Sequence, residues 1–261
     1  DYVISGYRSH TQAIGKGIPP EQVVSELFGK HAGCSKGKGG SMHMFSHKQR
    51  FLGGHGIVGG QAPLATGVAF SIKYQKKPEV IVCYLGDAAM NQGVVFESFN
   101  MASTWDLPVL FIIENNLYGM GTAITRTTNI ENLSDRALGF NMDASQVDGM
   151  NLISVYEHTR KIVDSMRQKP KPHLLEAMTY RFKGHSVSDP GNYRTSKEVS
   201  EYQEKDPISQ MATLLKEKKL ATDDKLKEWD KEQKDRVKVA EKFADEAPEP
   251  PVEEAWKHVY A

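Results

Sequence analysis

Two short runs of almost continuously apolar residues lie near the middle of the chain, at residues 80–85 and 108–113, and they constrain the fold more than any other feature. A stretch with helical character, from about residue 92 to residue 103, joins them. Apolar runs of this length joined by one helix are typical of parallel strands that are covered on both faces. The pattern therefore predicts a βαβ unit and an α/β fold.

The rest of the chain extends this fold. Residues 173–179 are predicted to form a third strand, which follows an amphipathic helix around residues 152–166. The charged region after residue 195 has apolar residues at helical spacing. Within it, Thr222 can cap a helix because acidic residues follow it, and the prolines from Pro248 onward are expected to end that helix.

Glycine is unevenly distributed, and most of it lies between residues 29 and 67. We expect this stretch to lack regular structure and interpret it as backbone that approaches something closely, because glycine has no side chain. The predicted organisation is one α/β domain, residues 1–195, with a parallel sheet flanked by helices on both faces. A helical C-terminal extension, residues 196–261, is expected to pack on the same domain.

Composition excludes several classes of protein. The 33 basic and 33 acidic residues give zero formal net charge, so no overall field attracts nucleic acid or an anionic membrane. The two cysteines, Cys34 and Cys83, lie far apart, which argues against a disulfide framework or a thiolate zinc site and favours an intracellular protein. No apolar run approaches the roughly 18 residues of a membrane span. We expect a soluble protein that binds neither nucleic acid nor membranes.

Polar residues follow both central strands, Asp87 after the first and Asn116 after the second. Ligands of parallel sheets bind beyond the carboxyl ends of the strands, so these two side chains are expected to lie close together. A carboxylate and an amide oxygen suit magnesium that carries a phosphorylated ligand. Gly86, Ala88 and Ala89 keep the turn open, so that backbone amides at the start of the next helix can face phosphate.

Each of these elements also has an ordinary structural interpretation. Asp87 can be the N-cap of the following helix, and Asn115 with Asn116 can form a loop that tolerates left-handed backbone. For either element alone this interpretation is preferred. Both elements together, each at the end of a buried strand and 29 positions apart, favour a binding site.

Gly-Asp followed just under thirty residues later by Asn-Asn resembles the thiamine diphosphate motif. The surrounding sequence is similar to the alpha subunits of the pyruvate dehydrogenase first component, in the thiamine diphosphate-dependent 2-oxo acid dehydrogenase family. Similar segments occur in family order at residues 36–44, 54–61, 86–93, 99–101, 114–122, 147–149, 184–191 and 193–195.

The resemblance implies a set of binding residues. Magnesium would be held by the Asp87 carboxylate, the Asn116 side chain and the Tyr118 backbone carbonyl. Thiamine diphosphate would contact Tyr7, Arg8, Gly56, Val58, Gly86, Asp87, Ala88, Ala89, Asn116, Tyr118 and His185. An arginine suits the diphosphate because its guanidinium group donates two parallel hydrogen bonds to oxyanions.

His10 and His185 match active-site histidines of the family, and we predict both as catalytic. A histidine in a polar loop, with an ordinary pKa near 6.5, can transfer protons or stabilise a developing oxyanion. The other histidines are interpreted as surface or core residues, except His55, which is left open. Those without a motif are His31, His47, His158 and His258.

The implied reaction is decarboxylation of pyruvate and transfer of the acetyl group to a lipoyl arm. The resemblance further implies a beta subunit that supplies an essential glutamate, an α2β2 heterotetramer, and a lipoyl-bearing acyltransferase. The chain alone is expected to be inactive. Acetoin is the second substrate considered and branched-chain 2-oxo acids the third. A non-catalytic assembly subunit that has lost cofactor binding is the alternative of another class.

The chain departs from the family pattern at Ala88, where the motif normally has glycine. An alanine is acceptable there only if the backbone angle is an ordinary one. The loop at residues 180–195 is expected to become ordered only with ligand or partner, and within it Ser186 matches a phosphorylated serine of mitochondrial relatives. The loop length favours a bacterial, cytoplasmic enzyme, or a matrix enzyme if the source is eukaryotic. Because Asp1 lies just before Tyr7, we expect a longer chain.

Overall fold

The computed structural model describes residues 1–257 and 259, so the interpretation of His258 lies outside the described residues. Two compact units make up the chain. The first consists of Asp1 with residues Val58–Thr222, and the second of Tyr2–Ile57 with Asp223–Ala261. The predicted division between residues 195 and 196 stays a prediction.

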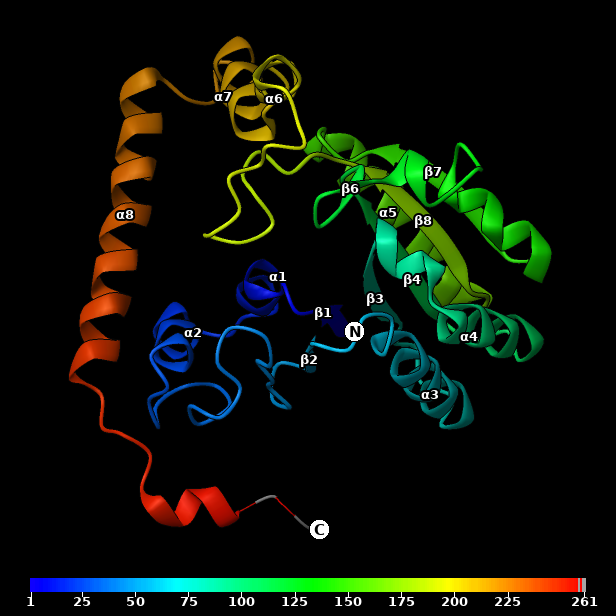
Figure 1. The fold of residues 1–261 in the computed structure, drawn as a ribbon, viewed down its shortest axis with the longest axis horizontal. Coiled ribbons are helices and arrows are strands. Elements are labelled where there is room, and N and C mark those ends of the chain that lie inside the picture. Colours follow the sequence, from blue (N-terminus) through cyan, green and yellow to red (C-terminus); the bar gives the residue numbers. More distant parts are fainter. Residues whose placement is uncertain (258, 260–261) are drawn as a thin grey trace. The chain divides into compact units, whose positions relative to one another are not determined.

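The first unit contains four parallel strands in the order β3, β4, β8, β7 (Figure 1). Their bounds are Ile81–Gly86 for β3, Val109–Asn115 for β4, His173–Met178 for β8 and Asp143–Asp148 for β7. The two apolar strands and the third strand of the sequence analysis are thus confirmed. β7 was missed because only Val147 of its six residues is buried, as befits a strand at the sheet edge.

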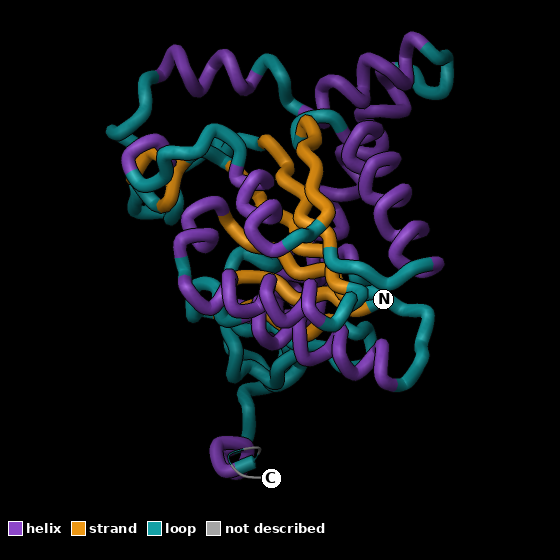
Figure 2. Tube along the Cα trace, turned by 90° about the vertical axis from the view of Figure 1, so that its right-hand side faces the viewer, coloured by secondary structure: helices purple, strands orange, loops and turns teal. Residues whose placement is uncertain are grey.

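Helices cover both faces of this sheet, namely α3 (Gln61–Tyr74), α4 (Gly93–Thr104) and α5 (Leu152–Gln168). Side chains of β4 alternate between the faces. The ring of Phe111 packs on Phe99 of α4, with ring centroids 4.8 Å apart. Its neighbours Leu110 and Ile112 join a buried cluster with Met166 of α5. Figure 2 shows the orange strands with purple helices around them. The predicted α/β class, with a parallel sheet flanked by helices, is confirmed.

Short elements follow the strands of the first unit. They are the 3₁₀ helices η1 (Asp87–Asn91), η2 (Ile124–Arg126) and η3 (Leu133–Phe140), the strands β5 (Tyr118–Gly119) and β6 (Thr122–Ala123), and the helices α6 (Ser196–Gln203) and α7 (Pro207–Glu217). β5 and β6 form an antiparallel hairpin. Side-chain caps begin both helices, since Thr195 accepts from the Glu198 amide and Asp206 from the Ile208 amide.

The second unit combines two parallel strands with helices from both ends of the chain. Its elements are β1 (Tyr2–Gly6), α1 (His10–Gly15), α2 (Pro20–Leu27), β2 (Phe51–His55), α8 (Asp223–Glu246) and the 3₁₀ helix η4 (Val252–Trp256). α2 and α8 pack side by side. α8 begins directly after Thr222 and ends before Pro248, which confirms the predicted start and stop.

The expectation that residues 29–67 lack regular structure is wrong at β2 and at the start of α3. The strand glycines have a packing reason. A Cβ at Gly53, where φ is +99°, would overlap the Phe45 ring, and one at Gly54 would lie 2.6 Å from the Ser9 hydroxyl. Glycine in this strand therefore permits close approach by neighbours rather than preventing strand formation.

Two expectations about the whole chain can be compared with the described residues. Cys34 and Cys83 are free thiols, which agrees with the prediction that no disulfide framework exists. Within residues 1–257 and 259, no helix is both long and apolar enough to cross a membrane.

Candidate functional site

The first half of the predicted magnesium site lies where β3 ends. Asp87 opens the 3₁₀ helix η1 directly after the strand, and only 3% of the residue is exposed. Gly86 pairs with Glu114 of β4, and a Cβ on Gly86 would meet nothing within 4 Å. The strand end therefore presents a nearly buried carboxylate beside open space.

The second half is the turn that follows β4. Asn116 accepts a hydrogen bond from the Tyr118 amide through its side-chain oxygen, at 3.3 Å. Between them, Leu117 has a φ of +70°, a left-handed conformation that costs energy for a residue with a branched side chain. Tyr118 and Gly119 then form β5. The turn places the Asn116 amide and the Tyr118 carbonyl within three residues of each other.

The structure brings these two halves together. η1 contacts β5, and a Cβ built on Gly119 would lie only 2.6 Å from the methyl group of Ala88. Ala88 itself is absent from the described residues with positive φ, so its backbone angle is ordinary and alanine meets no conformational penalty. The departure from the family motif is thus accommodated by a glycine on the facing strand.

A cluster of tyrosines fastens β5 to helix α6. The hydroxyl of Tyr118 donates to Glu198 at 2.9 Å, and the hydroxyl of Tyr180 donates to the same carboxylate oxygen at 2.9 Å. Burial and this hydrogen bond raise the pKa of Tyr180 to about 12. The guanidinium of Arg194 lies over the rings of Tyr118, Tyr180 and Tyr193, at 5.3 to 5.8 Å from their centroids. The contacts of its side chain therefore hold Tyr118 in place.

His185 lies in a loop that is organised by Asp189. One carboxylate oxygen of Asp189 accepts from the His185 amide, from His185 Nδ1 and from the Tyr193 hydroxyl, each at 2.7 Å. The other oxygen accepts from the Gly191 amide at 2.9 Å. The Tyr193 hydroxyl and the two backbone amides hold the pKa of Asp189 far below its usual range. An ionised Asp189 fixes the His185 tautomer, with the proton on Nδ1 and Nε2 as the basic nitrogen.

Four of the predicted site residues lie in the second unit. His10 begins α1, and its Nε2 lies 3.0 Å from the Ser41 carbonyl oxygen, to which it donates. Arg8 Nη1 lies 3.5 Å from the hydroxyl of Tyr7, its neighbour in sequence. A Cβ on Gly56 would lie 3.1 Å from the His43 ring, so this glycine makes room for a histidine. The other predicted residues, Val58 included, belong to the first unit.

The glycine-rich loop at residues 33–40 wraps around a carboxylate that sequence reasoning missed. Glu26 of α2 is fully buried, and its two oxygens accept from the amides of Ser35, Gly37, Gly39 and Gly40 at 2.7 to 3.1 Å. A Cβ on Gly33 or Gly39 would overlap Glu26 or the His43 carbonyl. The close approach inferred from the glycines is therefore an approach to this chain's own glutamate, for which the sequence of α2 gives no signal.

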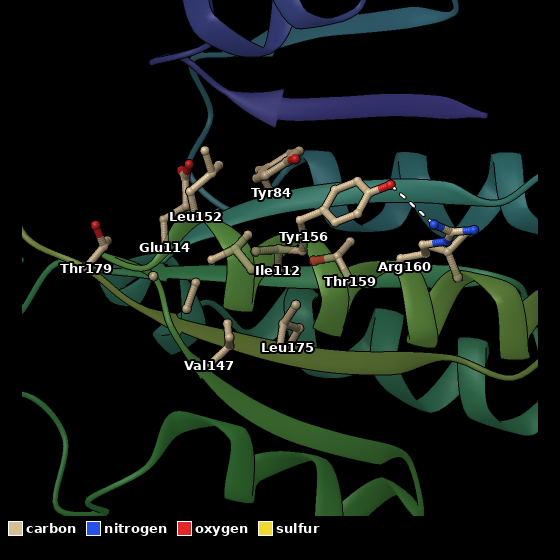
Figure 3. A pocket seen from close by; sticks show the side chains of 14 residues that line it. Tyr84, Ile112, Glu114, Val147, Leu152, Tyr156, Thr159, Arg160, Leu175 and Thr179 are labelled. Atoms are coloured by element: carbon tan, nitrogen blue, oxygen red, sulfur yellow. Dashed lines mark hydrogen bonds between the residues drawn. The ribbon is translucent and has the colours of Figure 1, made fainter. Parts of the chain in front are cut away.

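A separate cavity of about 540 Å³ lies between the sheet and α5 (Figure 3). Its walls are mainly apolar and include Tyr84, Ile112 and Leu175 from three strands. Near Tyr156, a hydrogen bond of 3.4 Å joins Arg160 to the tyrosine hydroxyl. The cavity contains none of the predicted site residues.

Among the described residues, no cluster of three or more His, Cys, Asp or Glu side chains could hold a metal, so a metal at Asp87 needs amide and carbonyl oxygens as well.

The chain is similar to known proteins over nearly its whole length. Residues 1–253 match the family model described as dehydrogenase E1 component. The chain is 42% identical over 260 residues to the pyruvate dehydrogenase E1 component subunit alpha of Rickettsia typhi, covering 100% of this chain and 80% of that protein. It is 46% identical to the protein of that name from Rhizobium meliloti, over 99% and 75%. A mitochondrial protein from Sminthopsis macroura is 43% identical, over 100% and 71%.

Proposed function

Since the chain belongs to the dehydrogenase E1 component family, we propose that it is the alpha subunit of a thiamine diphosphate-dependent pyruvate dehydrogenase. The observation that carries the proposal is the meeting of Asp87 and η1 with the Asn116–Tyr118 turn at the carboxyl edge of the sheet. In parallel sheets this edge is where ligands bind. The bacterial cytoplasm, or the mitochondrial matrix in a eukaryote, remains the predicted location.

The residues at this edge fit magnesium and a diphosphate. Asp87 offers a nearly buried carboxylate, and Asn116 and Tyr118 offer an amide and a carbonyl oxygen, which are the hard donors that magnesium prefers. The Tyr118 carbonyl oxygen accepts a hydrogen bond of 3.5 Å from Arg181 Nη1, which orients this carbonyl. The open space at Gly86 leaves room for a ligand next to the carboxylate. Family membership implies thiamine diphosphate, and magnesium is part of the proposal.

When bound, thiamine diphosphate supplies the carbon nucleophile that such enzymes use on the oxo group of a 2-oxo acid. The chain's own residues bind the cofactor and orient the substrate. Ala88 and Ala89 offer backbone at the start of η1 to the diphosphate, and His185 Nε2 accepts or holds a proton at the substrate. Asp189 keeps His185 in that tautomer. By the family likeness, Tyr7 and Arg8 would bind the diphosphate of the cofactor. The backbone of Gly56 and Val58 would hold its aminopyrimidine ring, and His10 would face the substrate.

The proposal includes two protein partners. The relatives are called subunit alpha, so we infer a beta subunit that completes the enzyme as an α2β2 heterotetramer. A lipoyl-bearing acyltransferase would accept the acetyl group. The chain on its own is expected to be inactive because no glutamate in it is assigned to activation of the cofactor.

The decisive experiment co-expresses the full-length chain with its beta subunit and titrates thiamine diphosphate with magnesium by calorimetry. Release of carbon dioxide from pyruvate is then measured. Asp87→Asn should lower cofactor affinity by at least about a hundredfold, because a metal-ligating carboxylate is replaced by a neutral amide. The matched control is Asp143→Asn at the opposite, amino end of the sheet, which should bind normally.

Each result has a distinct meaning. Binding with turnover of pyruvate supports the proposal. Binding with turnover of acetoin or branched-chain 2-oxo acids, and not of pyruvate, would change the proposed substrate but support the proposed cofactor. Absence of binding in the native pair would favour an assembly subunit that has lost its cofactor.

A further inference from the structure

A fully buried glutamate stands behind the turn that carries the predicted metal ligands. Glu176 in the middle of β8 is 0% exposed. One of its oxygens accepts from Asn115 Nδ2 at 2.7 Å. The other accepts from the Ser134 amide at 3.0 Å and from Gln146 Nε2 at 3.4 Å. Three donors from three different elements thus converge on one carboxylate.

This carboxylate decides which way the Asn115 amide points. A carboxylate only accepts hydrogen bonds, so Asn115 must turn Nδ2 towards Glu176. Its Oδ1 then points the other way, where it accepts from the Leu117 amide at 3.1 Å. The Asn115 carbonyl is fixed too, because it accepts from the Thr179 amide at 2.9 Å. Asn115, 2% exposed, is therefore held at both its side chain and its backbone.

The turn that Asn115 begins needs such support. Leu117 and Met120 both have left-handed backbone, with φ of +70° and +53°. Such conformations cost energy in residues other than glycine and persist only where the surroundings impose them. The hydrogen bond from the Leu117 amide to Asn115 is one such constraint, and it exists only in the amide orientation that Glu176 selects.

From this chain of contacts we propose that Glu176 is a positioning residue. Through Asn115 it holds the turn at residues 116–118, and thereby presents the Asn116 amide oxygen and the Tyr118 carbonyl to the cation. The inference rests on the proposed function as far as the cation is concerned. The positioning of the turn itself is a property of the protein without any ligand.

Glu176→Gln breaks this arrangement with almost no change of shape. The new amide has one donor end, which must face either Asn115 Nδ2 or the pair of donors from Ser134 and Gln146. If it faces Asn115, the asparagine must flip, and its Nδ2 then faces the Leu117 amide, donor against donor. Either choice leaves buried donors unsatisfied.

A second substitution restores every bond. In the double variant Glu176→Gln with Asn115→Asp, the glutamine donates to one oxygen of the aspartate, and the other oxygen accepts from the Leu117 amide. The glutamine oxygen accepts from Ser134 and Gln146. The negative charge has moved from position 176 to its hydrogen-bond partner at position 115, but all donors again have acceptors. The pair therefore provides a rescue that a general loss of stability would not show.

Two measurements on the full-length chain with its beta subunit test the inference. Hydrogen exchange without cofactor reads the amides of Leu117 and Tyr118 directly. Calorimetry reads the affinity for thiamine diphosphate with magnesium. In Glu176→Gln we expect exchange in the turn to accelerate at least about tenfold and affinity to fall about tenfold to a hundredfold, as for other residues that orient metal ligands. The double variant should recover most of both.

The control is Glu254→Gln, which removes another nearly buried carboxylate in the other unit and should leave the turn and the binding unchanged. Unchanged exchange at Leu117 and Tyr118 in Glu176→Gln would overturn the inference, as would a double variant no better than the single one. If the single variant does not fold, the double variant tests the inference by itself. Slow exchange at Leu117 and Tyr118 and native cofactor affinity in the double variant would then support the inference. If the native pair does not bind the cofactor, the proposed function fails, while exchange still tests positioning.

Discussion

The glycine-rich loop at residues 33–40 and the histidine loop at residues 184–195 are both irregular, and each is organised around one carboxylate. In the first, Glu26 comes from a helix outside the loop and is fully buried. Its two oxygens accept from four backbone amides of the loop. In the second, Asp189 belongs to the loop itself, and two of its partners are the side chains of His185 and Tyr193.

The difference separates a scaffold from a movable part. A loop whose amides bind a carboxylate on a helix is fixed to that helix, and disturbing it disturbs the packing around α2. The aspartate of the histidine loop keeps His185 oriented within the loop, while Tyr193 and Arg194 at the end of the loop attach it to Arg181 and Tyr118. Val187 in this loop is fully exposed. The first design suits a wall of the molecule, and the second suits an active-site lid.

The largest effect is expected from Glu26→Gln. The glutamine keeps one accepting oxygen, so two buried loop amides lose their acceptor. We expect the free energy of unfolding to fall by about 2–4 kcal/mol, from unsatisfied buried donors. Chemical denaturation followed by circular dichroism measures it.

The control for that variant is Glu21→Gln in the first turn of the same helix, which should cost only a few tenths of a kcal/mol through the helix dipole. If the two variants were equally stable, the glycine-rich loop would not depend on its carboxylate. The comparison between the loops would then lose its first half.

Asp189→Asn should act locally. We expect proteolytic cleavage within residues 184–195 to accelerate about tenfold, because the amide cannot accept every bond that the carboxylate accepts. Global unfolding should change little. Limited proteolysis of the folded variant and of the unsubstituted chain measures the rate of loop cleavage. Chemical denaturation measures the free energy of global unfolding. A large loss of global stability would show that the histidine loop is a fixed wall like the other one.

The native loop gives a pH test of the same contact. The pKa of Asp189 is depressed in the folded chain. Its contribution is therefore complete above the unfolded value near 4 and is lost only as the pH falls towards the lower folded value. Between pH 8 and pH 5 the native loop should show constant protection. Protection that changes in this interval would mean that Asp189 does not control the pH dependence of the loop.

The strands and helices of the first unit could be predicted because apolar runs and helical spacing record burial directly. The continuous apolar run of β4 predicts a strand buried on both faces, and Phe111 and Ile112 do pack on opposite faces. β7 and β2 could not be predicted in this way. The first is polar at the sheet edge, and the second contains Gly53 and Gly54, whose reason lies in side chains distant in sequence.

Asp87 and Asn116 could be found from sequence because both follow apolar strands. The residues that hold them in place could not. Glu176 carries a faint signal, an acidic residue inside an apolar strand, but its partners come from three elements that only the fold brings together. Glu198 stands three positions after the capping Thr195, which by pattern suits a reciprocal cap, yet its side chain binds two tyrosines instead.

The smallest effect, expected from Glu254→Gln, sharpens the view of the glycine-rich loop as a fixed wall. Glu254 of η4 forms ion pairs with Lys36 and Lys38 of that loop and with Lys257. Lys257, followed by Lys36, holds the pKa of Glu254 at about 2, so the contact should persist at neutral pH and weaken as the pH falls from about 4.5 towards 2. At pH 7 the variant should raise hydrogen exchange at the Glu254 amide by only about threefold, because exposed lysines contribute weakly. A larger rise that spreads to Gly37 and Gly39 would mean that η4, and not Glu26, fixes the loop.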